Sequence, residues 1–287
     1  MMMERPSLAL THAGHFHADD VFSAALLQEV WPGLEIRRAY EVPEGFEGLA
    51  FDVGGGAFDH HGPERKLREN GMPYAAFGLL WKELGEQLVG AEQAKWLDEH
   101  FIQPLDRDDN TGCGDSLADA IGGFNPVWDS DADADACFWR AEAFAAQVLK
   151  NRLEGARAVN RAKALVEKAL ARMKDHVVVL PRFAPWKNTL KSSDAELVVY
   201  PSQRGGFSAQ GVPIPDDPKH RLKCRFPESW AGLRAPQLER VSGIRGLRFC
   251  HASGFLVSAN TLESALAACR AARAEAQEKQ RAGETGA

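Results

Sequence analysis

The sequence predicts an α/β protein with two domains: a parallel sheet with flanking helices in the first, and a smaller α+β domain after it. Over the first half, apolar segments of strand length alternate with longer segments whose apolar residues recur at helical spacing. Beyond a long Ala-rich helical stretch, short strand-like segments dominate the second half. The length of 287 residues also exceeds that of one average domain. We therefore predict domains 1–174 and 175–287.

The individual elements follow from these periodicities. A buried strand is predicted at 7–11, followed by a helix at 19–30 and alternating strands at 34–40 and 48–53. Strand, helix and strand in this order indicate a parallel sheet with crossover connections. The remaining first-domain elements are a short strand at 57–59, helices at 74–89 and 91–105, and a long helix at 136–174 with one break near Gly155. The second-domain elements are strands at 176–180, 195–200, 206–212 and 247–258 and a final helix that begins at Thr261.

The composition excludes several classes of protein. Hydrophobic residues make up 45% of the chain and charged residues 26%, and no apolar run approaches the length of a membrane-spanning helix. Five scattered cysteines without a Cys-x-x-Cys pair argue against a disulfide framework and against a thiolate zinc site. The N-terminus lacks the apolar region of a signal peptide, so we expect a cytoplasmic protein with no membrane partner.

Side chains that bind metal ions cluster in three short segments, each near the end of a predicted strand. The first has the spacing His12-x4-His17-x-Asp19, the second is Asp52 before a run of glycines, and the third contains His60. Imidazole and carboxylate donors without thiolate are typical of hydrolytic sites for Mn²⁺, Mg²⁺, Co²⁺ or Zn²⁺. Any one of these side chains alone is more often an ordinary polar residue, but their recurrence at successive strand ends favours a site.

Two divalent cations are the expected occupants of this site. A carboxylate such as Asp52 can bridge two cations with its two oxygens, and a helix end supplies a further ligand, either Asp106 or Asp109. Such a pair lowers the pKa of water and clamps the attacking and leaving oxygens of a phosphoryl group. The sequence thus predicts metal-dependent hydrolysis, with phosphoesters as the favoured substrates.

Charge is distributed unevenly along the chain. The net charge is −6, yet residues 201–250 contain nine Lys or Arg against four Asp or Glu. A local basic stretch in an acidic protein suits a phosphate-bearing ligand better than general adhesion to duplex DNA, and its alternative is a solvated basic face. Aromatic residues in or near this stretch favour nucleic acid through base stacking, with core packing as their alternative: Phe207, Phe226, Trp230 and Phe255.

An ordered set of motifs spans most of the chain. In the first half these are Thr11-His12-x-Gly14-x-Phe16-His17-x-Asp19-Asp20, Phe51-Asp52-Val53-Gly54-Gly55, Phe58-Asp59-His60-His61 and Asp106-x-x-Asp109-Asn110. In the second half they are Ser208-x-Gln210-x-Val212-Pro213, Pro227-x-x-Trp230-x-Gly232-Leu233 and His251-Ala252-Ser253-Gly254-Phe255. Together they resemble the Myg-type branch of the DHH phosphoesterase superfamily, the metal-dependent hydrolases related to the melanocyte proliferating gene product.

The resemblance implies a two-domain phosphoesterase that uses Mn²⁺ or Mg²⁺, with its active site in the cleft between a DHH-type domain and a substrate-binding domain. It implies that His12, His17 and Asp52 hold one cation, and that Asp19, Asp52, His60 and Asp106 hold the other. His61 is implied as a charge stabiliser or proton donor at the scissile phosphate, and Asp20 is the second catalytic candidate. The segment after Asp106 departs from the family pattern Asp-x-Ile-Asp-Asn-Gly, which leaves Asp109 as the alternative ligand.

Members of this branch are described as 3′–5′ exonucleases acting on RNA, so the resemblance favours single-stranded RNA or short oligonucleotides as substrates. Substrate contacts are expected from five residues of the second domain: Arg204, Arg221, Arg225, His251 and Ser253. One alternative is a small-nucleotide or phosphoanhydride hydrolase of the same superfamily. Another is a non-catalytic metal- or nucleic-acid-binding protein, which would lack a ligand, and none is missing. No particular oligomeric state is predicted.

Overall fold

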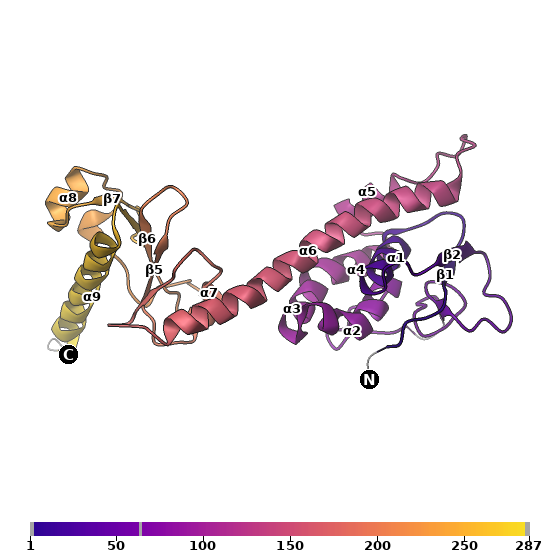
Figure 1. Cartoon of the computed structure of the whole chain (residues 1–287), viewed down its shortest axis with the longest axis horizontal. Coiled ribbons are helices and arrows are strands. Elements are labelled where there is room, and N and C mark those ends of the chain that lie inside the picture. Colours follow the sequence, from indigo (N-terminus) through magenta and orange to yellow (C-terminus); the bar gives the residue numbers. More distant parts are fainter. Residues whose placement is uncertain (1–2, 63–64, 285–287) are drawn as a thin grey trace. The chain divides into compact units, whose positions relative to one another are not determined.

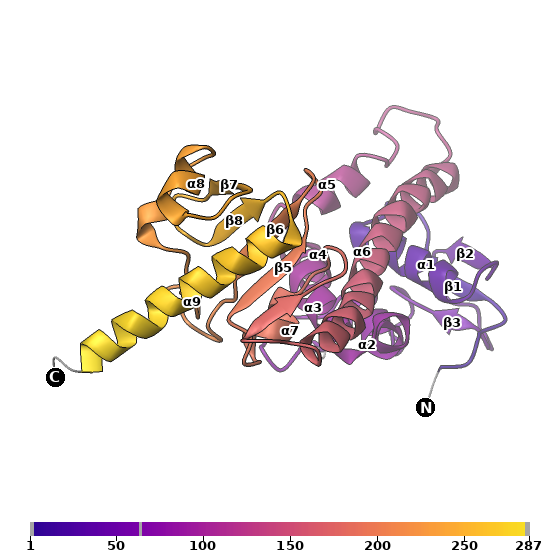
Figure 2. The same cartoon turned by 60° about the vertical axis from the view of Figure 1, so that its left-hand side comes forward.

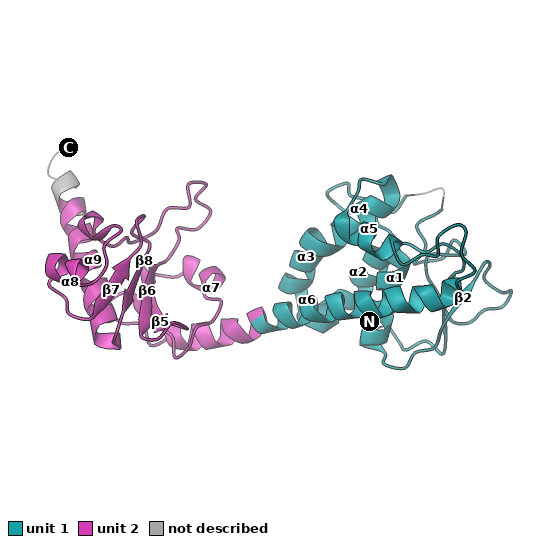
Figure 3. Ribbon diagram, turned by 90° about the horizontal axis from the view of Figure 1, so that it is seen from above, with its two compact units in different colours: residues 1–158 teal, residues 159–287 magenta. Residues whose placement is uncertain are grey.

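The structure, a computed structural model, describes residues 3–62 and 65–284 of the chain (Figure 1). It divides into two compact units, residues 1–158 and 159–287, each with its own buried core (Figure 3). The division falls inside the long helix α6 (Ala134–Leu170), whereas the boundary predicted from the sequence lies at residue 174, just after that helix.

The first unit is built on a three-stranded parallel sheet, which confirms the predicted mixture of parallel strands and helices. Strand β1 lies in the centre and pairs in parallel with β2 on one side and β3 on the other. The first elements are β1 (Ala9–His12), α1 (Ala18–Val30), β2 (Ile36–Ala39) and β3 (Leu49–Ala50). The fourth strand predicted at 57–59 is only a single bridge between Phe51 and Phe58. Because β1 and β3 are parallel, the residues that follow them lie at the same edge of the sheet.

Helices pack beside α1 in this unit. The helix predicted at 74–89 is α2 (Ala76–Val89), which packs directly against α1. The helix predicted at 91–105 is a continuous helical run whose middle turn is wider than an α-helix. Its parts are α3 (Ala91–Leu97), a π-helix (Asp98–Ile102) and α4 (Gln103–Thr111). Helix α5 (Ser116–Gly122) is not expected from the sequence, although Asp115 caps its N-terminus.

Helix α6 runs from Ala134 to Leu170 without interruption, so the break predicted near Gly155 is wrong. A glycine inside a helix costs about 1 kcal/mol relative to alanine. The long Ala-rich flanks on both sides outweigh a cost of that size. Nothing lies within 4 Å of the position that a Cβ of Gly155 would take, so this glycine is not required by packing.

The second unit contains a five-stranded sheet in the order β4-β5-β6-β8-β7, antiparallel except for the β4–β5 pair. Its strands are β4 (Val177–Val179), β5 (Leu197–Pro201), β6 (Phe207–Gly211), β7 (Leu247–Cys250) and β8 (Leu256–Ala259). The last two form a hairpin where the sequence predicts one strand at 247–258. Helix α9 (Leu262–Glu284) packs across one face of this sheet (Figure 2). The short helices are α7 (Lys187–Lys191), the 3₁₀-helix η2 (Glu228–Trp230) and α8 (Gln237–Ser242).

Across residues 3–62 and 65–284, no helix is both long and apolar enough to cross a bilayer.

Candidate metal centre

The C-terminal end of β1 leads directly into the first group of ligand-type side chains. His12 is the last residue of β1, His17 immediately precedes α1, and Asp19 and Asp20 lie in the first turn of α1. Asp20 Oδ1 accepts a hydrogen bond from the backbone N–H of His17 at 2.9 Å, which closes this turn. The helix N-terminus favours negative charge at these positions. Both carboxylates are nevertheless completely buried, which is rare for acids that lack a paired charge.

The second and third groups lie on one loop with unusual backbone angles. Asp52 adopts φ +53°, in the left-handed region, and Gly54 follows at φ +82°. Buried Asp59 closes the loop, because its Oδ2 accepts from the N–H of Gly55 at 2.6 Å and its Oδ1 from the N–H of His61 at 3.0 Å. The first residue of the Asp-His-His motif therefore holds the loop in shape, and the two histidines after it reach the cluster.

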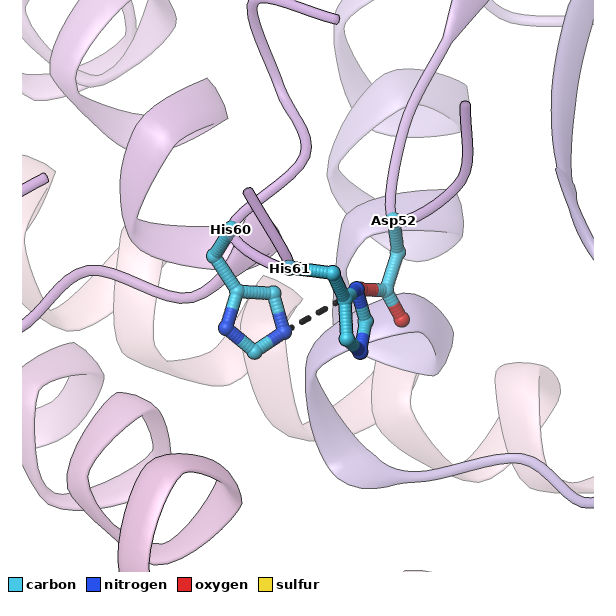
Figure 4. A group of neighbouring side chains, drawn as sticks. All are labelled: Asp52, His60 and His61. Carbon is cyan, nitrogen blue, oxygen red and sulfur yellow. Dashed lines mark ion pairs between the residues drawn. The ribbon is translucent and has the colours of Figure 1, made fainter. Parts of the chain in front are cut away.

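Asp52 contacts three histidines of the cluster, two of which are drawn beside it in Figure 4. Its Oδ2 is 3.2 Å from His12 Nε2, and its Oδ1 is 3.2 Å from His60 Nε2 and 3.4 Å from His61 Nδ1. Figure 4 shows the rings of His60 and His61 on the same side of the Asp52 carboxylate. Each oxygen of Asp52 thus faces a different set of donors, which is the arrangement that a bridging carboxylate needs.

The remaining acids of the cluster lie on opposite sides of Asp52. Asp20 Oδ2 is 3.2 Å from His12 Nε2. On the other side, His60 Nε2 is 3.0 Å from Asp109 Oδ2 and 3.7 Å from Asp19 Oδ2. Within each of three triads the ligand atoms lie within 4.8 Å of one another: His12, Asp20 and Asp52; His17, Asp19 and Asp109; and Asp52, His60 and His61.

The electrostatics of the cluster follow from this excess of carboxylates. Burial lowers the pKa of His12, but hydrogen bonds to Asp20 and Asp52 outweigh burial and raise that pKa to about 10. Burial, together with the charges of Asp52 and Asp109, raises the pKa of Asp19 well above its ordinary value. Positive charge is therefore strongly favoured at this site, whether it comes from protons or from bound cations.

Despite these short approaches, several buried polar atoms of the cluster make no hydrogen bond of good geometry: Asp19 Oδ1, Asp20 Oδ2, Asp52 Oδ1 and His60 Nε2. A buried polar atom left without a partner costs roughly 1–3 kcal/mol, so a group of them calls for an explanation. Coordination to divalent cations would satisfy these atoms. Oxygen and imidazole nitrogen donors without sulfur fit Mn²⁺, Mg²⁺, Co²⁺ or Zn²⁺.

Asp106, one of the two alternative helix-end ligands, contacts Arg68 and a backbone N–H of α2 and does not belong to these three triads. Its Oδ2 accepts from Arg68 Nη2 at 2.7 Å, and its Oδ1 accepts from the N–H of Gly78 at 3.1 Å. Burial raises the pKa of Asp106 to about 7, even though Arg68 acts in the opposite direction. One turn later on α4, Asp109 reaches His60 instead. Of the two alternatives, the structure brings only Asp109 to the cluster.

Gly78→Ala is expected to destabilise the protein by about 2 kcal/mol, although alanine is the better helix former. A Cβ at position 78 would overlap the carboxylate of Asp106 and the guanidinium of Arg68, which hold each other in place. The matched control is Gly155→Ala, which has open space around the new Cβ and should stabilise the protein by about 0.5–1 kcal/mol. Chemical denaturation measures both changes. A Gly78→Ala protein as stable as the wild type would show that this packing is loose.

The cluster borders a cavity of about 570 Å³. His17, His60, His61 and Asp109 line this cavity, together with the exposed Arg65. Arg65 is not among the residues predicted from the sequence, where its one signal is a positive charge shortly after the Asp-His-His motif. A guanidinium at the edge of a metal centre suits a phosphate group.

The predicted substrate-binding residues of the second unit fall in three separate places. Arg225 Nη1 donates to the backbone carbonyl of Ser253 at 3.3 Å, and His251 Nδ1 lies 2.9 Å from Ser253 Oγ. Arg225, His251 and Ser253 therefore lie next to one another, close enough to contact the same substrate. Arg221 forms an exposed ion pair within its own loop. Arg204 lines a different cavity on the sheet.

The chain is similar to the members of one protein family over most of its length. Residues 8–272 match MYG1_exonuc, described as "Uncharacterised protein family (UPF0160)". The chain belongs to this family. It is 32% identical to the MYG1 exonuclease of Homo sapiens, over 92% of this chain and 85% of the relative. It is 31% identical to the MYG1 exonuclease of Mus musculus, over 92% and 84% of the two chains. It is 28% identical to a MYG1 protein of Chlamydia pneumoniae, over 93% and 97%.

Membership of the MYG1 family confirms the resemblance to the Myg-type branch found in the sequence motifs. No solved structure matches this chain.

Proposed function

We propose that this chain is a metal-dependent phosphoesterase of the DHH type that removes nucleotides from the 3′ end of single-stranded RNA or short oligonucleotides. The observation that carries the proposal is the buried cluster around Asp52, whose two carboxylate oxygens face different donor groups. The names of the human, rat and mouse relatives, which are called exonucleases, support a phosphodiester as the bond that is broken.

Charge balance supports two cations in this centre. The cluster contains four carboxylates, and two divalent cations carry the matching positive charge. We assign one cation to His12, Asp20 and Asp52, and the other to His17, Asp19, Asp52, His60 and Asp109. Relative to the set implied by the resemblance, Asp109 replaces Asp106, His17 moves to the second cation, and Asp20 becomes a ligand rather than a catalytic group. Mn²⁺ is our first choice because the family resemblance implies it, and the donors also suit Mg²⁺, Co²⁺ or Zn²⁺.

When bound, the cations supply an activated water and neutralise charge on the phosphoryl oxygens. The chain itself supplies a proton-carrying group beside them. Asp59 Oδ1 lies 2.8 Å from His61 Nδ1, and because a carboxylate only accepts, Nδ1 carries a proton. The other ring nitrogen, Nε2, accepts a proton in the neutral ring and donates one in the protonated ring, as a general acid–base group must. Arg65, on the same cavity, is the group that we assign to phosphate binding.

The test is hydrolysis of a short 5′-labelled single-stranded RNA by protein that has been stripped of metal with a chelator. We expect no cleavage before Mn²⁺ is added, and afterwards a ladder of labelled products that shortens from the 3′ end. Intact RNA alongside a cleaved dinucleotide would replace the exonuclease with a small-nucleotide hydrolase on the same centre. Metal binding without cleavage of either substrate would overturn a hydrolytic function altogether.

A further inference from the structure

The sheet of the second unit has two differently covered faces. Side chains alternate along its strands, so Ala209, Val257 and Ala259 face the core under α9. Ser208 and Ser258, one position away, lie on the opposite face and pair across β6 and β8. Over β4 and β5, that opposite face is covered by the end of α6 and by α7. Over β6, β8 and β7, the same face borders a cavity of about 610 Å³.

This cavity combines aromatic rings with uncompensated positive charge. Its rings are Phe183, Tyr200 and Phe249, and its charged side chains are Arg204, Arg234 and Arg248. Every charged side chain that lines it is an arginine. Within the described part of the chain, no carboxylate lies within ion-pair distance of these three guanidinium groups. The cavity is therefore built for an anion, since cationic walls without counter-charges favour negative ligands.

The cations and the rings are held next to one another. The guanidinium of Arg234 lies over the ring of Phe249, 4.8 Å from its centroid. Arg248 Nη1 donates to the backbone carbonyl of Gly205 at 2.9 Å, which ties β7 to the β5–β6 turn. Phe183 packs edge-on against the ring of Tyr200 at 5.2 Å and is still 51% exposed. A ligand that fits must therefore present a planar apolar group and an anionic group close together.

We propose that this cavity binds one nucleotide of a single-stranded nucleic acid, with the base against the rings and the phosphates on the arginines. The inference rests on the proposed function in one respect: it takes the ligand to be a nucleic acid. The hydroxyls of Ser208 and Ser258 on the floor of the cavity offer hydrogen bonds to the base or the sugar. Base stacking and guanidinium–phosphate contacts are the two interactions on which sequence-independent strand binding depends. An acidic peptide would use the arginines but not the exposed ring of Phe183.

The test is binding of a short fluorescent oligouridylate to metal-stripped protein in the presence of chelator, measured by anisotropy at several salt concentrations. Arg204→Ala and Arg234→Ala should each weaken binding about five- to tenfold and lower the salt dependence by the equivalent of one phosphate contact. Phe249→Leu keeps an apolar side chain and should weaken binding at least about fivefold through lost stacking. The matched control is Arg240→Ala, an exposed arginine of the same basic stretch that does not line the cavity, and its affinity should match wild type.

Because the chelator prevents hydrolysis, the outcome is separate from the test of the metal centre. Loss of RNA affinity in the three variants, with melting temperatures unchanged, supports the cavity even if no RNA is ever cleaved. A different result would refute RNA binding in the cavity: the three variants bind RNA with the affinity and salt dependence of the wild type. If the wild type also cleaves RNA, the proposed exonuclease function is retained. Nucleic acid is refuted as the ligand if the wild type binds oligoglutamate more tightly than oligouridylate and the variants lose affinity for both ligands equally.

Discussion

Asp52→Asn is expected to lower kcat for RNA hydrolysis on the order of 10³-fold or more while the chain keeps its fold. Asp52 faces His12 with one carboxylate oxygen and His60 with the other, both at 3.2 Å, so it is the residue that both cations would share. Asparagine is the appropriate replacement because it tolerates the left-handed backbone of this residue, φ +53°, better than alanine does. The amide removes a negative charge and leaves the volume of the side chain almost unchanged.

Calorimetric titration of the metal-stripped Asp52→Asn protein with Mn²⁺ should show that tight binding is lost for at least one of two cations. Asp131→Asn is the matched control, since this aspartate is exposed on a loop of the same unit and lies outside the cluster. Its activity and Mn²⁺ binding should equal those of wild type. Full turnover by Asp52→Asn would remove the bridging role and with it the two-cation assignment.

Asp109→Asn and Asp106→Asn are expected to separate catalysis from stability. Asp109 lies 3.0 Å from His60 within the cluster, so its replacement should reduce kcat on the order of 10²-fold or more and change the free energy of unfolding by less than about 1 kcal/mol. Asp106 is completely buried and accepts hydrogen bonds from Arg68 and Gly78, so its replacement should lower that free energy by about 2 kcal/mol, while Arg68 keeps its pair with Asp98. Chemical denaturation in chelator and RNA hydrolysis below the unfolding transition measure the two quantities.

Each of these two variants serves as the control for the other, because they make the same chemical change one turn apart on α4. The folded Asp106→Asn protein should keep its kcat within about tenfold of wild type, since Arg68 and Asp106 act through the position of the helix. The opposite pattern, with an inactive but stable Asp106→Asn protein and an active Asp109→Asn protein, would restore Asp106 as the ligand.

Local sequence pattern predicts the parts of the centre that depend on strand ends. His12 ends β1 and Asp52 follows β3, and parallel strands bring such residues to one edge of the sheet. The same periodicity predicts most helices correctly, because an apolar face at helical spacing must be buried. The prediction of a helix break at Gly155 is wrong, because the long helical segments on both sides stabilise α6 by more than one glycine destabilises it.

The choice between Asp106 and Asp109 is a different kind of problem. Both acids lie on one helix, three residues apart, and only their depth distinguishes them. That depth depends on Arg68 and Gly78, which belong to other segments of the chain and meet Asp106 at 2.7 and 3.1 Å. Asp59 poses the same problem. The sequence around it does not show whether Asp59 binds a metal ion or, as in the structure, accepts hydrogen bonds from backbone N–H groups of its own loop.

The chain's order of residues thus determines which donors exist, at which strand ends they stand, and that they lack thiolate. Only the tertiary structure decides which carboxylates face one another and that Asp20 lies beside His12. It also decides that three arginines, Arg204, Arg234 and Arg248, share one cavity with aromatic rings. The physical reason is the separation along the sequence over which each interaction acts. Backbone periodicity is set by neighbours within a few residues, whereas burial and the pairing of charges depend on contacts between segments far apart in the sequence.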